Sequence, residues 1–168
     1  DLKVRKLIEH VRNRGFRVLN LTAIEREQLL ETRTIVETAA ARMAVRNASA
    51  ADVAELRDIA ERFGARIESA SFDDLRLWNG MFHERLYALS GNDVLVAEIQ
   101  ALRQRGIPGS ANDGGIWRTV GGLARSHEDH VEMLRLIDER DEDGLAALID
   151  RHINRTRALF PKASAQER

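Results

Sequence analysis

The chain contains two prolines, Pro108 and Pro161, among its 168 residues. Because proline interrupts a helix more strongly than any other residue, the long intervals without it leave the backbone free to form helices. Three short segments, TAIE at 22–25, SAAD at 49–52 and SFDD at 71–74, each place a hydroxyl residue three positions before a carboxylate. This capping pattern is typical of helix starts, so the chain is predicted to be mainly helical.

The spacing of apolar residues and the breaks between them predict six helices. These helices span 23–46, 50–69, 72–89, 93–104, a segment from 117 or 123 to 139, and 142–159. The start of the fifth helix depends on whether Gly121 and Gly122 interrupt it. A chain of this length can bury most of its apolar surface in one domain. The predicted fold is therefore all-α, an antiparallel bundle of about six helices.

The N-terminal segment differs from the rest of the chain. Two alternating apolar segments, LIEHV and GFRVL, lie on either side of RNR and predict a short β-hairpin. Residues 1–18 carry six Lys or Arg and two acidic residues, a local charge of 6 − 2 = +4, whereas the whole chain has a net charge of −1. A basic hairpin is therefore expected in front of the helical bundle.

Composition limits the chemistry that is available. The chain has no cysteine, which excludes disulfides and thiolate metal ligands. No apolar run reaches the length of a membrane span, and the N-terminus lacks the apolar region of a signal peptide. We therefore expect a cytoplasmic protein whose metal ligands, if it has any, are histidine, carboxylate or amide groups.

Several predicted helices have a polar residue within their apolar stripe. In the third helix, Asn79 and His83 lie one turn apart on the apolar side. His130 occupies such a position in the fifth helix, and His152 does so in the sixth. A single histidine in an apolar stripe is more often a hydrogen-bonded core residue than a ligand. Three of them on three helices can meet at one level of an antiparallel bundle, which favours a shared site.

Neutral imidazoles with one oxygen ligand suit a divalent transition metal. We therefore predict a metal site formed by Asn79, His83, His130 and His152, with zinc as the first candidate and nickel or manganese as alternatives. His127 lies one turn before His130 on the same side and could replace or supplement it. An exposed or capping role also fits His127, so it ranks second.

Arg33 interrupts the apolar stripe of the first helix. A buried guanidinium is costly unless an anion meets it, and a carboxylate can be bound by both of its outer nitrogens. We therefore predict that Arg33 binds a small organic acid beside the metal. Glu37, one turn further along the helix, is the alternative partner and would make Arg33 a structural residue.

The motifs of this chain resemble those of a known family. NRGFRVLNLTAIEREQLLETRTIVETAAARMAV, at 13–45, resembles the junction between wing and first effector-domain helix in GntR-superfamily repressors of the FadR subfamily. FHERLYALSGN, the Asp129-His130 pair and ERDEDGLAALIDRHI resemble segments of that subfamily's ligand-binding domain, known as FCD. The order of these motifs and the interval of 22 residues from His130 to His152 make the combination fairly specific.

The resemblance implies a helical effector domain in which an acidic residue and three histidines bind a metal, beside which small organic acids bind. Asn79 stands at the acidic position, and His83, His130 and His152 stand at the histidine positions. Asparagine keeps an oxygen but has no charge, so a bound dication would keep its full positive field. Arg33 of ETR stands where the family's arginine reaches the effector carboxylate.

The resemblance also implies a domain division. Residues 1–20 would be the remnant of a winged-helix DNA-binding domain, 21–161 the effector domain and 162–168 a disordered tail. Arg12, Arg14 and Arg17 in the wing are candidates for phosphate contacts, which position a protein on DNA without reading its sequence. The full-length protein is expected to bind operator DNA as a homodimer, whereas this chain is not expected to bind it specifically. The alanine-rich segment 39–44 was the predicted place of close helix approach in that dimer.

These inferences together predict the sensing domain of a transcription regulator, not an enzyme. One alternative is a metal-dependent hydrolase on a helical bundle, in which an open metal position activates water. Against it, HEDH at 127–130 is not the adjacent His-Asp pair of HD-type phosphohydrolases, and no spare inward carboxylate is evident as a base. A second alternative is a metal-free domain in which Asn79 and the histidines surround an organic ligand.

Overall fold

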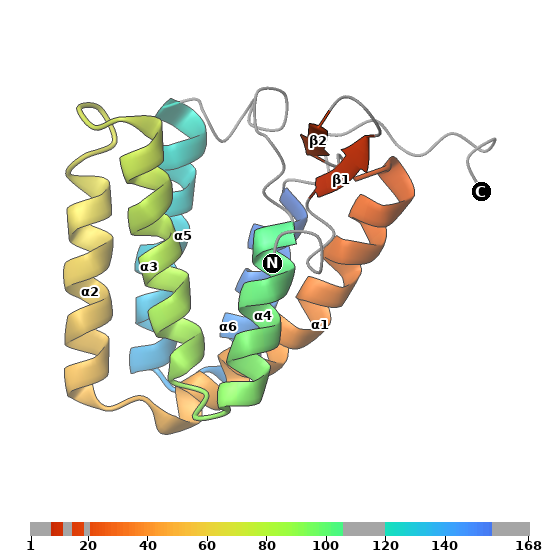
Figure 1. Ribbon diagram of the computed structural model, residues 1–168. Helices are drawn as coiled ribbons and strands as arrows, with labels where there is room; N and C mark the ends of the chain where they lie inside the picture. The colour runs from red at the N-terminus through yellow and green to blue at the C-terminus, as the bar shows by residue number, and fades with distance from the viewer. Residues whose placement is uncertain (1–7, 12–14, 19–20, 106–119, 156–168) are drawn as a thin grey trace.

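The computed structural model describes residues 8–11, 15–18, 21–105 and 120–155. In this part of the chain, β1 (Ile8–Val11) and β2 (Gly15–Val18) precede six helices (Figure 1). The helices are α1 (Ala23–Asn47), α2 (Ala50–Gly64), α3 (Phe72–Ala88), α4 (Asp93–Arg105), α5 (Val120–Asp138) and α6 (Glu142–Asn154). The prediction of an all-α bundle of about six helices is confirmed.

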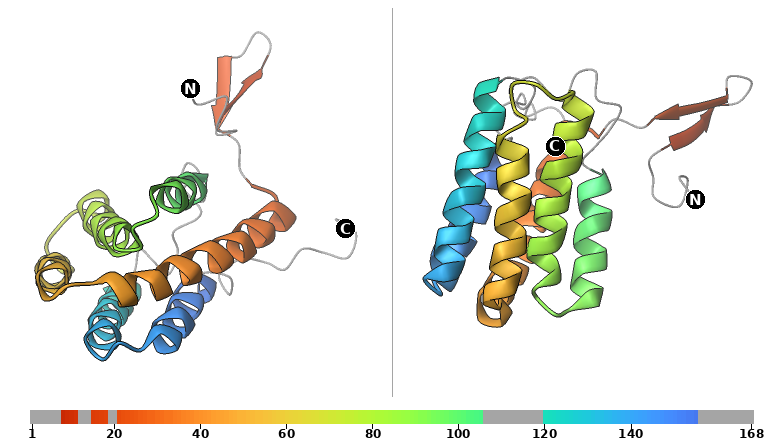
Figure 2. Two further views of the ribbon diagram at one scale, coloured as in Figure 1. Left: turned by 90° about the horizontal axis from the view of Figure 1, so that it is seen from below. Right: turned by 90° about the vertical axis from the view of Figure 1, so that its left-hand side faces the viewer.

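The helices pack around one shared interior. The longest, α1, contacts α3, α4, α5 and α6, while α2 packs on α3 and α5. Figure 2 shows the other helices nearly end-on with α1 running obliquely across them. The largest fully buried side chains include Tyr87, Phe63, Phe82, Leu56 and Leu86. The predicted ligands lie on α3, α5 and α6. Helix α5 packs on α6, and α1 contacts all three of these helices.

The predicted capping residues begin the first three helices. Thr22 and Ser49 form complete capping boxes with Glu25 and Asp52, and Ser71 accepts a hydrogen bond from the backbone N–H of Asp74. Each of these bonds satisfies a backbone donor that the first turn of a helix would leave unpaired. The helix starts were therefore readable from local sequence.

Three helix boundaries differ from or refine the prediction. Helix α2 ends at Gly64, so the predicted end at residue 69 was wrong. After Gly64 the backbone changes to tighter turns, in which the N–H of Arg66 and Ile67 donate to carbonyls three residues earlier. Helix α5 begins at Val120, so Gly121 and Gly122 do not interrupt it. Helix α6 ends at Asn154, and the predicted continuation to 159 lies outside the described residues.

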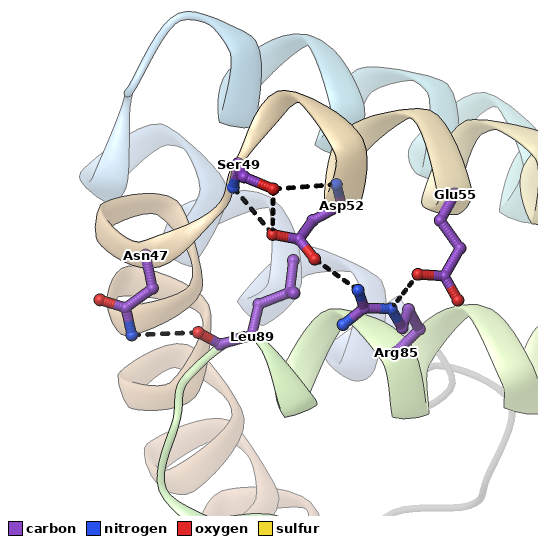
Figure 3. Close-up of polar contacts among 6 residues, drawn as sticks. All are labelled: Asn47, Ser49, Asp52, Glu55, Arg85 and Leu89. Atoms are coloured by element: carbon purple, nitrogen blue, oxygen red, sulfur yellow. Dashed lines mark hydrogen bonds and ion pairs between the residues drawn. The ribbon is translucent and has the colours of Figure 1, made fainter.

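Polar contacts fix α3 against α2 and against the end of α1 (Figure 3). Arg85 on α3 donates to Glu55 over 2.6 Å and to Asp52 over 2.5 Å, and both carboxylates lie on α2. Asn47, the last residue of α1, donates to the backbone carbonyl of Leu89 over 3.0 Å. These contacts set the rotation and height of the helix that carries Asn79 and His83.

The predicted hairpin is present. Strands β1 and β2 pair antiparallel, with Ile8 opposite Val18 and Val11 opposite Gly15. Arg12 and Arg14 lie outside the described residues, as does the predicted tail at 162–168. Arg17 lies in β2, and its proposed contact with DNA stays a prediction. None of the described helices is long and apolar enough to cross a membrane.

The alanine-rich segment 39–44 does not have the role predicted for it. Ala40, Ala41 and Ala44 are buried within the single chain, in the same core cluster as Leu145 and Ile149 of α6. Their small side chains thus serve packing inside the bundle rather than a contact between two copies. The argument for a dimer from this segment was therefore wrong, and the homodimer itself stays a prediction.

Candidate metal centre

The structure brings together three of the four predicted ligands. His83 of α3, His130 of α5 and His152 of α6 each offer a ligand atom, and these atoms all lie within 4.8 Å of one another. The Nε2 atoms of His83 and His130 are 3.4 Å apart. Two nitrogens bound to a tetrahedral zinc ion at about 2.0–2.1 Å from it lie about 3.4 Å apart. The spacing of this pair therefore already suits a common ion.

Burial keeps two of these rings neutral. His83 is 1% exposed and His130 is 0% exposed. Desolvation holds the pKa of both well below the ordinary value, and for His83 the nearby charges of Arg103 and His152 lower it further. A neutral imidazole is the form that binds a metal, so protons compete weakly for these two side chains near neutral pH.

Both rings also have a nitrogen that the protein leaves unpaired. The Nδ1 atoms of His83 and His130 are buried and have no hydrogen-bond partner among the described residues. A buried polar atom without a partner costs free energy. Phe82 stacks on His130 with ring centroids 4.0 Å apart, so this ring has little room to turn toward another partner. The Nε2 atoms contact each other across the cluster instead, and this pair of neutral imidazole nitrogens fits a divalent cation.

His152 is oriented by a carboxylate. Its Nδ1 donates to Oδ2 of Asp129 over 2.7 Å, which leaves Nε2 as the nitrogen available to a metal. Arg155 binds both oxygens of the same carboxylate, over 2.6 and 3.0 Å. Burial raises the pKa of Asp129, but the hydrogen bonds from His152 and Arg155 outweigh it and bring the pKa to about 2. A permanently ionised Asp129 therefore fixes the tautomer of His152, as carboxylates behind metal-binding histidines commonly do.

Asn79 lies one turn before His83 on α3 and is 8% exposed. Its Oδ1 accepts a hydrogen bond from Ser126 of α5 over 3.3 Å, and Ser126 itself lies one turn before His130. The Asn79–Ser126 contact therefore repeats the His83–His130 contact one turn further along the same pair of helices. Its role as the oxygen ligand stays a prediction.

His127 does not join the cluster of three. Its ring packs against Gly64, where a Cβ atom would lie 2.5 Å from its Nε2, and against Phe63 with ring centroids 6.2 Å apart. A side chain at position 64 would displace this ring. His127 thus lies between α5 and the end of α2, apart from the cluster of three.

Arg33 lies in a second buried polar group, formed around Glu37. Glu37 is 0% exposed, and its Oε1 accepts a hydrogen bond from Nε of Arg33 over 2.6 Å. Its Oε2 accepts from Tyr87 Oη over 2.6 Å and from Nη1 of Arg103 over 3.1 Å. Burial raises the pKa of Glu37, but the two guanidinium groups outweigh it and lower the pKa. Arg33 therefore pairs with Glu37, the partner that the sequence offered as the alternative to an effector carboxylate.

The two polar groups are neighbours. The ring of Tyr87 stacks on that of His83 with centroids 6.0 Å apart, while its hydroxyl reaches Glu37. Sequence reasoning missed Tyr87, Arg103 and the supporting role of Asp129. Asp129 had a signal in its place beside His130, whereas Arg103 lies on a helix whose packing only the folded structure reveals. Figure 1 shows α3 beside α4, the helix that carries Arg103.

Comparison with known proteins identifies the fold. The family model of the FCD domain matches residues 28–155, most of the chain and all three clustered histidines. The chain belongs to the FCD domain family. Over 143 residues it is 29% identical to the Nta operon transcriptional regulator of Aminobacter aminovorans, a match that covers 85% of this chain and 65% of that regulator. This FCD chain therefore spans slightly less than two thirds of that relative.

Solved structures support the same fold. The FCD chain superposes on McbR/YncC of E. coli with a TM-score of 0.84 at 20% identity, covering 94% of this chain and 78% of that one. It superposes on GntR of Streptococcus agalactiae with a TM-score of 0.65 at 16% identity, covering 94% and 77%. At these identities the likeness shows the shared fold alone.

Proposed function

We propose that this FCD chain is the effector-sensing part of a DNA-binding transcription regulator. In this proposal His83, His130 and His152 hold a divalent metal, zinc before nickel or manganese, with Asn79 as a further ligand. The observation that carries the proposal is the convergence of three imidazoles from three helices, two of them buried with their Nε2 atoms 3.4 Å apart. The regulator with which the chain shares 29% identity supports the regulatory role.

The proposed effector is a small organic acid. A bound metal would supply a Lewis-acidic centre for one carboxylate. Among the described residues, Arg33 is anchored through its Nε, which leaves the outer edge of its guanidinium for bidentate contact with an anion. An acid bound at this place would contact α1 together with α3, α5 and α6, and would favour one arrangement of these helices over another. In a homodimer on operator DNA, that preference would change the placement of the paired DNA-binding domains.

No chemical reaction is part of this proposal. Asp129, the carboxylate beside the histidine cluster, is bound by His152 and by both outer nitrogens of Arg155. A carboxylate held in this way, with a pKa of about 2, is a poor general base at neutral pH. The hydrolase alternative therefore gains no support from the residues around the cluster.

A thermal-shift experiment tests the sensing role. Lactate and citrate are added to the metal-loaded protein, and both are expected to raise its melting temperature because they bind the folded state. Arg33→Ala should abolish that shift while the metal content stays unchanged. Arg42→Ala is the matched control, because Arg42 lies on the same helix but pairs with the exposed Asp143 at the surface.

The outcomes separate the roles of Arg33. If lactate and citrate raise the melting temperature of Arg33→Ala as much as that of the wild type, this arginine serves the Glu37 ion pair alone. Loss of both the shift and the metal would mean that Arg33 supports the fold of the whole centre. Absence of any shift in the wild-type protein, with either acid, would contradict the proposed effector class.

A further inference from the structure

The buried group around Glu37 contains one negative and two positive charges, a sum of 2 − 1 = +1. A guanidinium has five N–H donors. In the contacts with Glu37, Arg33 uses Nε and Arg103 uses Nη1, and no further hydrogen bond of these two side chains occurs among the described residues. Their side chains are 17% and 20% exposed. Several donors therefore remain for an anion that arrives from solvent.

The neighbouring histidine cluster adds no negative charge of its own. Asn79 is neutral where a carboxylate would have compensated half of a divalent charge. The carboxylate that contacts the cluster, Asp129, is paired with Arg155. With a dication bound to neutral ligands, the two groups together would carry 2 + 1 = +3. A single carboxylate would leave +2 of this charge without a partner.

Tyr87 places the two groups side by side. Its ring stacks on His83, the guanidinium of Arg103 lies 6.0 Å from the centre of the same ring, and its hydroxyl binds Glu37. Arg103 comes from α4 and Arg33 from α1, so the two guanidinium groups approach Glu37 from different helices. The histidine cluster and the arginine pair therefore border the same tyrosine side chain.

We propose that Arg103 is a second anion-binding residue of this site and that the effector is a small acid with two carboxylates. One carboxylate would bind at the histidine cluster and the other at Arg33 and Arg103, with Glu37 as the positioning residue that spaces the two guanidinium groups. The proposal rests on the proposed function. Its physical basis is that uncompensated charge in a buried site is costly, so a dianion is favoured over a monoanion of the same size.

Two four-carbon acids test the ligand class. Malate and 2-hydroxybutyrate both carry an α-hydroxy carboxylate, and malate alone has a second carboxylate. Calorimetric titration of the metal-loaded protein should give a dissociation constant for malate at least about tenfold lower, the effect of one good charge-assisted hydrogen-bonding contact. The metal content is measured after each titration, so that removal of the ion by malate is recognised.

Variants of α4 test the residue. Arg103→Gln should raise the dissociation constant of malate about tenfold and that of 2-hydroxybutyrate less than about threefold. Arg105→Gln is the matched control, since it removes the same charge from the exposed end of α4 and should change neither. If Arg103→Gln does not fold, Arg103→Lys keeps the charge beside Glu37 and should still weaken malate selectively, because lysine lacks the planar fork.

The results distinguish this proposal from the one on which it rests. Equal affinity for the two acids, or equal weakening of both by the variants of Arg103, would overturn the dicarboxylate proposal and leave the sensing role intact. Failure of the metal-loaded protein to bind either acid would overturn both. Selective loss of malate affinity in the Arg103 variants, with the Arg105 variant unchanged, is the result that the proposal predicts.

Discussion

Two buried polar groups lie side by side in this bundle and are built in opposite ways. Around Glu37 both carboxylate oxygens are bound, by two arginines and a tyrosine. In the cluster of His83, His130 and His152, two rings have an unpaired Nδ1, and their Nε2 atoms lie 3.4 Å apart. The carboxylate of the first group thus has all of its partners within the protein, whereas the second group leaves ring nitrogens without one in the part of the chain that the structure describes.

The difference predicts how much each group contributes to the stability of the metal-free fold. Removal of one partner from a buried ion pair strongly destabilises the fold. A buried polar group without partners already costs free energy, so its replacement by an apolar side chain of similar size costs little. In the metal-free protein, mutation of the Glu37 group should therefore cost much more stability than mutation of the histidine cluster.

The largest expected effect is at Glu37. Glu37→Gln removes the buried carboxylate that pairs with the partly buried guanidinium groups of Arg33 and Arg103, and should lower the free energy of unfolding by about 3–5 kcal/mol. His83→Leu, in protein treated with chelator, should stay within about 1 kcal/mol of wild type. Urea denaturation measures both. Asp138→Asn is the carboxylate control: it removes an exposed ion pair with Arg57 and should change stability by less than about 1 kcal/mol.

A reversed order, in which His83→Leu costs more than Glu37→Gln, would show that the histidine cluster is a structural part of the core. Such a result would make the comparison between the two groups wrong. Similar costs for both variants would mean that the unpaired nitrogens are satisfied by water in solution.

Asp129 links the histidine cluster to the protein around it. Asp129→Asn keeps the shape but weakens the hydrogen bond that orients His152, so metal affinity should fall by about 10- to 100-fold. A chelator competition measures this change. Glu132→Gln, a loss of charge on the exposed side of the same helix, should leave the affinity unchanged. Equal affinity in wild type and Asp129→Asn would exclude Asp129 from any supporting role.

Much of this architecture was predictable from the sequence, for identifiable reasons. Capping at Thr22 and Ser49 is local, and the helical spacing of His83, His130 and His152 within apolar stripes placed them inside the bundle. The position of Arg103 beside Glu37 was not predictable, because it depends on how α4 packs on α1 and α3. The early end of α2 was missed because the sequence after Gly64 keeps the residue spacing of a helix. The backbone hydrogen bonds there are those of tighter turns.

The pH dependence of stability follows from the lowered pKa of His83 and His130. In the unfolded chain these side chains titrate near about 6.5. Below that pH the unfolded state binds protons that the folded state excludes, so the metal-free protein should lose stability as the pH falls from 6.5 towards 5. The slope is at most about 1.4 kcal/mol per pH unit for each histidine.

Urea denaturation of chelator-treated protein between pH 5 and 7 measures that slope, and His130→Leu should remove a share of it. The lowered pKa of Asp129 and Glu37 contributes only below the ordinary carboxyl range and does not enter this window. A slope that His130→Leu leaves unchanged would mean that the buried rings are not the source of the pH dependence.

The smallest expected effect is at Asn79. Asn79→Asp adds a negative charge one turn from His83 and should tighten metal binding by up to about tenfold, because the ion gains a charged oxygen ligand. Ser126→Ala is the companion variant, since it removes the hydrogen bond to the Asn79 oxygen without adding charge. Weaker or equal metal affinity in Asn79→Asp would remove Asn79 from the set of ligands.

The central claim is that three histidines from three helices hold one divalent cation. The most direct measurement is elemental analysis of protein purified without chelator or nickel resin, for wild type and for His83→Ala, His130→Ala and His152→Ala. The account predicts about one ion per wild-type chain and a marked loss in each variant. A wild-type protein without metal after incubation with zinc, or three variants that keep the wild-type metal content, would contradict it.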